Sequence, residues 1–260
     1  MMRNSPTGSV FLALLLAFGV GMASHAATTP APAAEAATAE SRKLADLVDA
    51  YFEEQLKLNP LLATSIGDPR YNDRFEVTIS PAWRARDEQV EREFLERIRA
   101  IDPSLLTGQD ALTYQIFKSA REREIEGFRF PGHLIPVNQF YSVPNSFAQL
   151  GSGNGLHPFK TVKDYEDFLK RIDGFVAWTD RAIVNMREGI AKGYTLPKVL
   201  VERTLPQLAS QIVDKPEDSL YWGPVKNLPA SFTAEEQARL TAAYRAAIAT
   251  QVIPSYRRLH

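Results

Sequence analysis

Apolar residues recur every three to four positions between Thr161 and Gly193, the longest uninterrupted helical pattern in the chain. This spacing places them on one face of an α-helix, which must be buried. Thr161 with Asp164 predicts a capped amino end, and Gly193 predicts the carboxyl end. We therefore expect one long central helix over about 161–192. The positions on its buried face are Tyr165, Phe168, Leu169, Ile172, Phe175, Val176, Thr179, Ile183, Met186 and Ile190.

Shorter helical patterns lie on both sides of this helix. Pro60 predicts the end of the first, since the residue before a proline avoids helical geometry. Ser80 followed by Pro81, and Thr233 followed by Glu236, are helix-start signals. The expected helices are 41–59, 60–66, 81–101, 109–125, 197–212 with a kink at Pro206, and 234–260.

The second helix of the predicted 81–125 hairpin has a mixed pattern. We expect Leu112, Ile116, Phe117 and Ala120 to point inward. The charged run 121–124 alternates in sign and is typical of a solvated face.

Two segments, 128–160 and 214–231, lack helical periodicity and are rich in glycine and proline. We expect long irregular connections there, joining the helices of an all-α, multi-helix array. Long irregular segments in a compact domain are often functional, so Asn138, Gln139, Tyr141 and Asn145 are candidates for lining a pocket. The alternative is that these amides satisfy buried loop backbone.

The amino terminus predicts export. Arg3 precedes an apolar run from Val10 to Met22 and small residues around His25, so residues 1–26 match a signal peptide cleaved after Ala26. The alternative is a retained membrane anchor, although the run is shorter than a bilayer span. Residues 27–40 are low in complexity and rich in Ala and Pro, which predicts a disordered tether. We expect a periplasmic or secreted protein with no membrane association after cleavage.

Bulk charge and residue inventory narrow the function. The chain has 30 Lys plus Arg and 31 Asp plus Glu residues, so it has no net positive charge that would favour nucleic-acid binding. The chain has no cysteine, which excludes disulfides and thiolate metal sites. Four histidines are present, and a metal site within these residues would require His133 and His157 to meet. No HExxH, Gly-x-Ser-x-Gly or phosphate-loop motif occurs.

The last predicted helix still follows its apolar pattern at Leu259, next to the final residue His260. An apolar face with nothing after it in sequence suggests a partner elsewhere. We expect the complete protein to continue beyond this chain.

Several segments resemble one bacterial family in matching order. They are AYFEEQLKLNPLLATSIGDPRYNDRF, NQFYSVPNSFAQL, HPFKTVKDYEDFLKRIDGFVAWTDRAIVNMREGIAKGYTLPKVLVERTLPQL and VIPSYRRL. The family is domain of unknown function 885 (DUF885). The resemblance implies an exported, mostly helical zinc peptidase-like protein about twice this length. It also implies a metal motif in the second half, so none of the family's metal ligands, and no catalytic residue, falls on a position of this chain.

Two functional hypotheses follow. In the first, residues 41–260 are the N-terminal portion of an exported zinc-dependent peptidase-like hydrolase with a larger helical zincin-like fold, and form the helical wall of its substrate cleft. The missing C-terminal half would then be its partner and would hold the zinc. Asn138, Gln139, Tyr141 and Arg203 are the expected contacts to a peptide substrate. In the second, the chain is a non-catalytic exported helical module that binds a peptide or protein partner.

Overall fold

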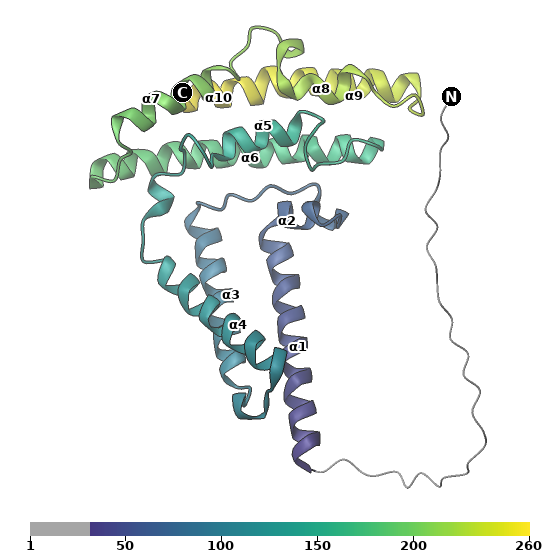
Figure 1. Ribbon diagram of the computed structural model, residues 1–260. Coiled ribbons are helices and arrows are strands. Elements are labelled where there is room, and N and C mark those ends of the chain that lie inside the picture. The colour runs from purple at the N-terminus through teal and green to yellow at the C-terminus, as the bar shows by residue number, and fades with distance from the viewer. Residues whose placement is uncertain (1–31) are drawn as a thin grey trace, which may run out of the picture.

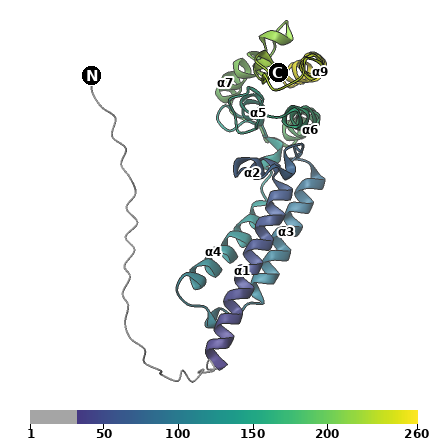
Figure 2. The same ribbon diagram turned by 90° about the vertical axis from the view of Figure 1, so that its right-hand side faces the viewer.

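The computed structural model describes residues 32–260, with side chains from residue 36. All regular structure in these residues is helical, which confirms the all-α class. Figures 1 and 2 show an arm of long helices that projects from a body of stacked helices. The predicted signal peptide lies outside the described residues. The arm consists of α1 (Pro32–Leu58), α3 (Pro81–Arg99) and α4 (Gly108–Gly127).

The body is built around the predicted central helix, α6 (Val162–Lys192). A short helix, α2 (Pro60–Ser65), lies between arm and body (Figure 1). The other helices of the body are α5 (Val143–Gly151), α7 (Lys198–Ala209), α8 (Gly223–Lys226), α9 (Ala234–Ala247) and α10 (Ile253–Leu259). Short turns of 3₁₀ helix occur at η1 (Pro69–Tyr71), η2 (Pro103–Leu105), η3 (Gly132–Leu134), η4 (Pro216–Asp218) and η5 (Leu220–Trp222).

Helix α1 begins at Pro32, whereas the sequence analysis placed a disordered tether up to Glu40. The helical part of that segment, 32–40, is rich in alanine, the residue with the highest helix propensity. Glu40 is 8% exposed, and its carboxylate accepts a hydrogen bond from the Asp102 backbone at 3.1 Å. The prediction of disorder for 32–40 is therefore wrong, because low complexity does not prevent an alanine-rich segment from extending a packed helix.

The inward face of α4 also differs from the prediction. Leu112 and Ile116 are 58% and 65% exposed, whereas Tyr114 and Arg121 are buried. Arg121 Nε lies 2.6 Å from Glu91 Oε2, and its guanidinium lies 3.9 Å from the centre of the Tyr51 ring. Tyr51 donates to Glu91 at 2.8 Å. A buried ion pair thus occupies the arm interior where the sequence analysis expected a solvated charge run.

Helix α5 occupies part of the segment that was predicted to be irregular. Phe147, Ala148 and Leu150 are buried along it, and Gly151 lies so close to Phe168 and Tyr221 that a Cβ at Gly151 would overlap their rings. The helix has only nine residues, so its periodicity is too brief to stand out between glycine- and proline-rich flanks. The prediction of a long irregular segment over 128–160 is wrong at this point.

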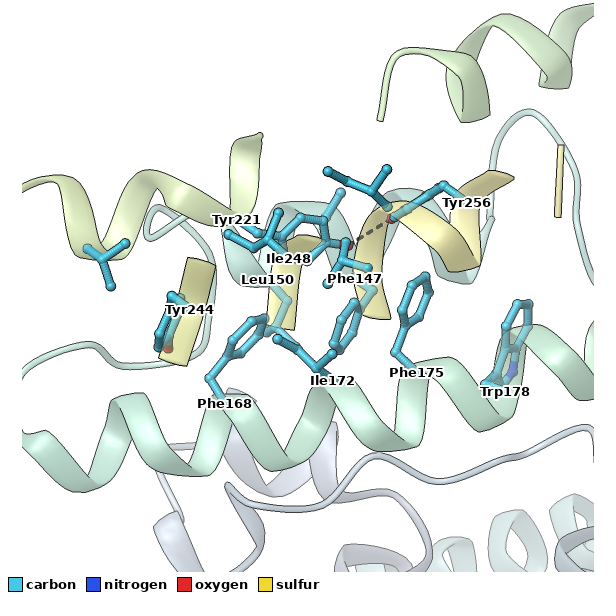
Figure 3. Close-up of a cluster of buried hydrophobic side chains, with 14 of the residues drawn as sticks. Phe147, Leu150, Phe168, Ile172, Phe175, Trp178, Tyr221, Tyr244, Ile248 and Tyr256 are labelled. Atoms are coloured by element: carbon cyan, nitrogen blue, oxygen red, sulfur yellow. Dashed lines mark hydrogen bonds between the residues drawn. The ribbon is translucent and has the colours of Figure 1, made fainter. Parts of the chain in front are cut away.

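Helix α6 confirms the predicted spine. Thr161 and Asp164 form both bonds of a capping box, and Gly193 adopts the left-handed conformation with φ 79°. Figure 3 shows Phe168, Ile172, Phe175 and Trp178 rising from α6 toward the helices that cover it. Ile190, assigned to the buried face from sequence, is 68% exposed, and the buried positions at this end of α6 are Asn185 and Gly189 instead.

The last predicted helix is interrupted. Between α9 and α10 the chain forms a π-helical turn, η6 (Ile248–Val252), whose Ile248 and Val252 side chains are fully buried. Pro254 lies two residues after Val252 and has no N–H to donate to the preceding turn. A π turn at this point keeps both flanking helices packed on α6 without the missing bond.

One buried arginine joins the arm side to the body. The Arg171 side chain on α6 is fully buried. Its guanidinium donates to the carbonyls of Tyr71 and Arg74, at 3.3 and 3.1 Å, and to the Thr64 hydroxyl at 2.5 Å. Three segments that precede α3 in the chain are therefore held on α6 by one side chain.

Candidate functional site

Asn138 fixes the loop that precedes α5. Its Oδ1 accepts hydrogen bonds from the backbone N–H groups of Phe140 and Tyr141, both at 2.8 Å. Its Nδ2 donates to the Tyr141 carbonyl at 3.2 Å. Side-chain bonds to the backbone two and three residues ahead hold a turn in one conformation. Asn138 therefore satisfies loop backbone, as the alternative from sequence proposed.

The same loop presents two aromatic side chains to solvent. Phe140 is 78% exposed and Tyr141 is 90% exposed, with ring centres 6.4 Å apart. We call residues 138–141 the aromatic loop. Exposed aromatic side chains on a fixed loop are characteristic of recognition surfaces, because they offer large contact areas at low entropic cost. Tyr141 was predicted from sequence and Phe140 was not, although both lie in the same turn.

Gln139 and Asn145 connect the aromatic loop to α7. Gln207 on α7 donates to the Gln139 carbonyl at 3.2 Å and accepts from the Asn145 amide at 2.5 Å. The Gln139 side-chain oxygen is buried and has no hydrogen-bond partner in the described part of the chain. Both residues thus position the loop against α7 rather than facing solvent.

Arg203 lies on α7, one helical turn before Gln207. Residues four apart share a helix face with Cβ atoms about 6 Å apart, so Arg203 lies on the side of α7 that Gln207 turns toward the loop. Its side chain is exposed, and within residues 32–260 it forms no ion pair. The structure brings Asn138, Gln139 and Tyr141 together on the loop and places Arg203 on the adjoining helix.

A small apolar pocket opens beside the aromatic loop, and sequence reasoning did not find it. Its volume is about 110 Å³. Val143, two residues after Tyr141, forms one wall, and Trp178 of α6 forms another. We call it the Val143 pocket. It is lined by Leu58, Asn59, Pro60, Leu61, Phe75, Glu76, Thr78, Val143 and Trp178.

A larger cleft of about 480 Å³ with both apolar and charged lining residues lies between α1, the segment 74–77 and the start of α3. Its charged side chains pair with one another. Glu54 contacts Lys57 at 2.7 Å and Arg86 at 3.2 Å, and Arg74 contacts Glu76 at 2.5 Å. The cleft therefore presents no unpaired charge to attract an ionic ligand.

Comparison with known proteins decides the family. The model of the family described as "Bacterial protein of unknown function (DUF885)" matches residues 60–260. The chain belongs to the DUF885 family. Among solved structures, it is similar to the crystal structure of a candidate lipoprotein from Colwellia psychrerythraea, with a TM-score of 0.67 and 16% identity. The match covers 85% of this chain and 40% of that one, so it establishes a shared fold.

No significant match exists among curated proteins. In the described part of this DUF885 chain, no helix combines the length and apolarity that crossing a bilayer requires.

The DUF885 resemblance implies zinc, and the described residues do not fit it. Residues 32–260 hold no group of three histidine, cysteine, aspartate or glutamate side chains that could bind a metal ion. His157 bonds the Asp164 carbonyl, whereas the carbonyl of His133 accepts from Asn185 at 3.0 Å. Asp164 and Asn185 lie about 30 Å apart along α6, so the two histidines do not meet.

Proposed function

We propose that this DUF885 chain is the N-terminal portion of an exported zinc-dependent peptidase-like hydrolase, in which the described helices form a wall of the substrate cleft. The observation that carries the proposal is the aromatic loop, whose backbone is held by Asn138 and by Gln207 of α7 and whose two rings are exposed. The chain spans 40% of the solved relative's length, which leaves room in such a protein for a separate metal-binding part.

In this proposal, the residues of the chain bind and orient a peptide. The rings of Phe140 and Tyr141 cover apolar parts of the substrate, and the guanidinium of Arg203, which has no ion-pair partner among residues 32–260, receives a carboxylate or carbonyl oxygen. Asn138 and Gln139 position the loop. Because no metal site fits the described residues, the hydrolytic step belongs to another part of the protein.

The test is substitution in the full-length protein of which these residues form a portion. We expect Tyr141→Ala and Arg203→Ala each to lower kcat/KM for peptide hydrolysis by about ten-fold, the loss typical of a truncated contact residue. Ile116→Ala and Arg123→Ala are matched controls, because both positions are exposed on α4. Unchanged kcat/KM in the two loop and α7 variants would refute the role of this surface.

A second candidate function is a non-catalytic exported module that binds a peptide or protein partner. The exposed Leu112 and Ile116, one turn apart on α4, favour it because apolar pairs on a helix often mark contact with another protein. The intact mass of the mature protein separates the two functions. A mass matching a chain from Ala27 to His260 favours the module, and a mass about twice as large favours the hydrolase.

Export is part of both candidates. It is supported by the signal-peptide pattern of residues 1–26 and by the similarity to a candidate lipoprotein. Cell fractionation with amino-terminal sequencing tests it. We expect the protein in the periplasmic or secreted fraction with Ala27 as its first residue.

A further inference from the structure

We propose that the Val143 pocket receives one aliphatic side chain, of valine, leucine, isoleucine or methionine, from a peptide that contacts the aromatic loop. The identity of the ligand as a peptide rests on the proposed function. The pocket itself, its size and its chemistry do not depend on catalysis.

The lining of the pocket matches an aliphatic group. Six apolar side chains surround it, and burying a hydrocarbon group against them is favourable in proportion to the area removed from water. Trp178 is 1% exposed, and Figure 3 shows it in the row of side chains that α6 turns toward the body core. The six are Leu58, Pro60, Leu61, Phe75, Val143 and Trp178.

The volume sets the size of the side chain. A cavity of about 150 Å³ accommodates benzene, with six carbons, and a water molecule occupies about 30 Å³ in the liquid. By both measures, a pocket of about 110 Å³ has room for three or four non-hydrogen atoms. Valine, leucine, isoleucine and methionine side chains meet this limit. The seven carbons of a phenylalanine side chain exceed it.

Two polar side chains that line the pocket, Asn59 and Thr78, can form hydrogen bonds with a peptide backbone. Asn59 precedes α2 without capping it, and its Nδ2 donates to Gln55 at 2.9 Å. Within the described residues, neither Asn59 Oδ1 nor the Thr78 hydroxyl has a hydrogen-bond partner. An acceptor and a hydroxyl in the lining of an apolar pocket can pair with the N–H and C=O groups next to an inserted side chain.

The pocket is within reach of the aromatic loop. Two peptide units separate Tyr141 from Val143, so their Cα atoms lie at most about 7.6 Å apart. Successive side chains of an extended peptide on one face are about 7 Å apart. A peptide in contact with Tyr141 can therefore place a neighbouring aliphatic side chain in the Val143 pocket.

Nuclear magnetic resonance of the indole N–H groups tests the proposal without any turnover. The chain has three tryptophans, Trp83, Trp178 and Trp222, and Trp178→Phe identifies the Trp178 signal. We expect N-acetyl-leucine methylamide to shift this signal saturably. N-acetyl-alanine methylamide should bind at least about ten-fold more weakly, since it lacks three buried carbons. The phenylalanine analogue should leave the signal unshifted.

Two substitutions on α2 provide the matched comparison. Leu61→Phe enlarges a residue that lines the pocket, and Leu62→Phe enlarges its neighbour, which does not line it and is similarly exposed. We expect only Leu61→Phe to abolish the leucine-dependent shift. No saturable shift in the wild-type protein, or equal binding of the three analogues, would overturn the inference. Peptide turnover that is insensitive to Tyr141→Ala, with leucine binding intact, would count against the proposed function instead.

Discussion

His157 is a buried histidine whose two partners determine its protonation state. Its Nε2 lies 2.8 Å from the Asp164 carbonyl, which can only accept, so Nε2 carries the hydrogen. Its Nδ1 lies 2.8 Å from the Arg171 guanidinium, which can only donate, so Nδ1 is unprotonated. Burial, which outweighs the bond to Asp164, and the Arg171 charge lower the pKa of His157 from 6.5 to about 4. The imidazole ring is therefore neutral at pH 7. Both of its nitrogens are hydrogen-bonded, so neither is free to bind a metal ion.

This arrangement predicts a loss of stability in mild acid. Between pH 6.5 and 4 the unfolded chain binds a proton at position 157 and the folded chain does not, so the free energy of unfolding decreases as the pH falls. The pKa difference of 6.5 against about 4 corresponds to about 3 kcal/mol at most. Urea unfolding at a series of pH values measures it.

The control is His157→Gln, which cannot be protonated. Burial raises the pKa of Asp87 to about 6, and this group opposes the histidine effect because the folded state binds its proton more tightly. Asp87 is present in both proteins, so the difference between their pH profiles isolates His157. Parallel profiles from pH 7 to pH 4 would show that His157 does not titrate as proposed.

At the scale of the element, helix ends were predictable and helix faces less so. Thr161, Ser80 and Thr233 cap the helices that they were expected to cap, because capping depends on residues close in sequence. The buried face of α4 depends on the ion pair between Arg121 and Glu91. Glu91 lies thirty residues before Arg121, so no local sequence pattern indicates this pairing. Charged side chains buried by a distant partner therefore account for the error on α4.

Gly174, in the middle of α6, lies where the segment around Phe75 packs closely against the helix. A Cβ at this position would overlap the backbone carbonyl of Phe75. Alanine normally stabilises a helix interior relative to glycine by about 1 kcal/mol. We expect Gly174→Ala to have the opposite sign and to destabilise the protein by about 1–3 kcal/mol, because the segment around Phe75 must move away. Thermal unfolding followed by circular dichroism measures the change.

Gly127, the last residue of α4, is the matched control. A Cβ there would meet no atom within 4 Å. Gly127→Ala should therefore leave the melting temperature unchanged or raise it slightly. If Gly174→Ala also raised the melting temperature, the close contact between α6 and the segment around Phe75 would be refuted.

At the scale of the whole molecule, the sequence located the spine, the all-α class and the family, but only part of the candidate site. Tyr141 was chosen for its residue type, and it is the most exposed of the large hydrophobic side chains described. The Val143 pocket was not predictable, since it combines α2, the segment 75–78, Val143 and Trp178. Such a site depends on how the arm meets the body, which periodicity along one helix does not encode.

The contact between the arm side and the body depends strongly on Arg171, and this dependence predicts how the whole molecule unfolds. Burial lowers the Arg171 pKa to about 10, so the guanidinium remains charged at neutral pH and holds its partners from the arm side. Arg171→Met keeps an unbranched apolar stem and removes the guanidinium with every donor, which leaves the buried Thr64 hydroxyl and His157 Nδ1 without that partner. We expect the arm and the body to unfold in one transition in the wild-type protein and in two transitions in this variant. Hydrogen exchange resolved by peptide measures the unfolding of the arm and of the body separately.

Lys170→Met is the control, because it removes only an exposed ion pair with Asp73, and it should retain the single transition. A single, uniformly weakened transition in Arg171→Met would mean that apolar contacts, rather than this arginine, couple the two parts.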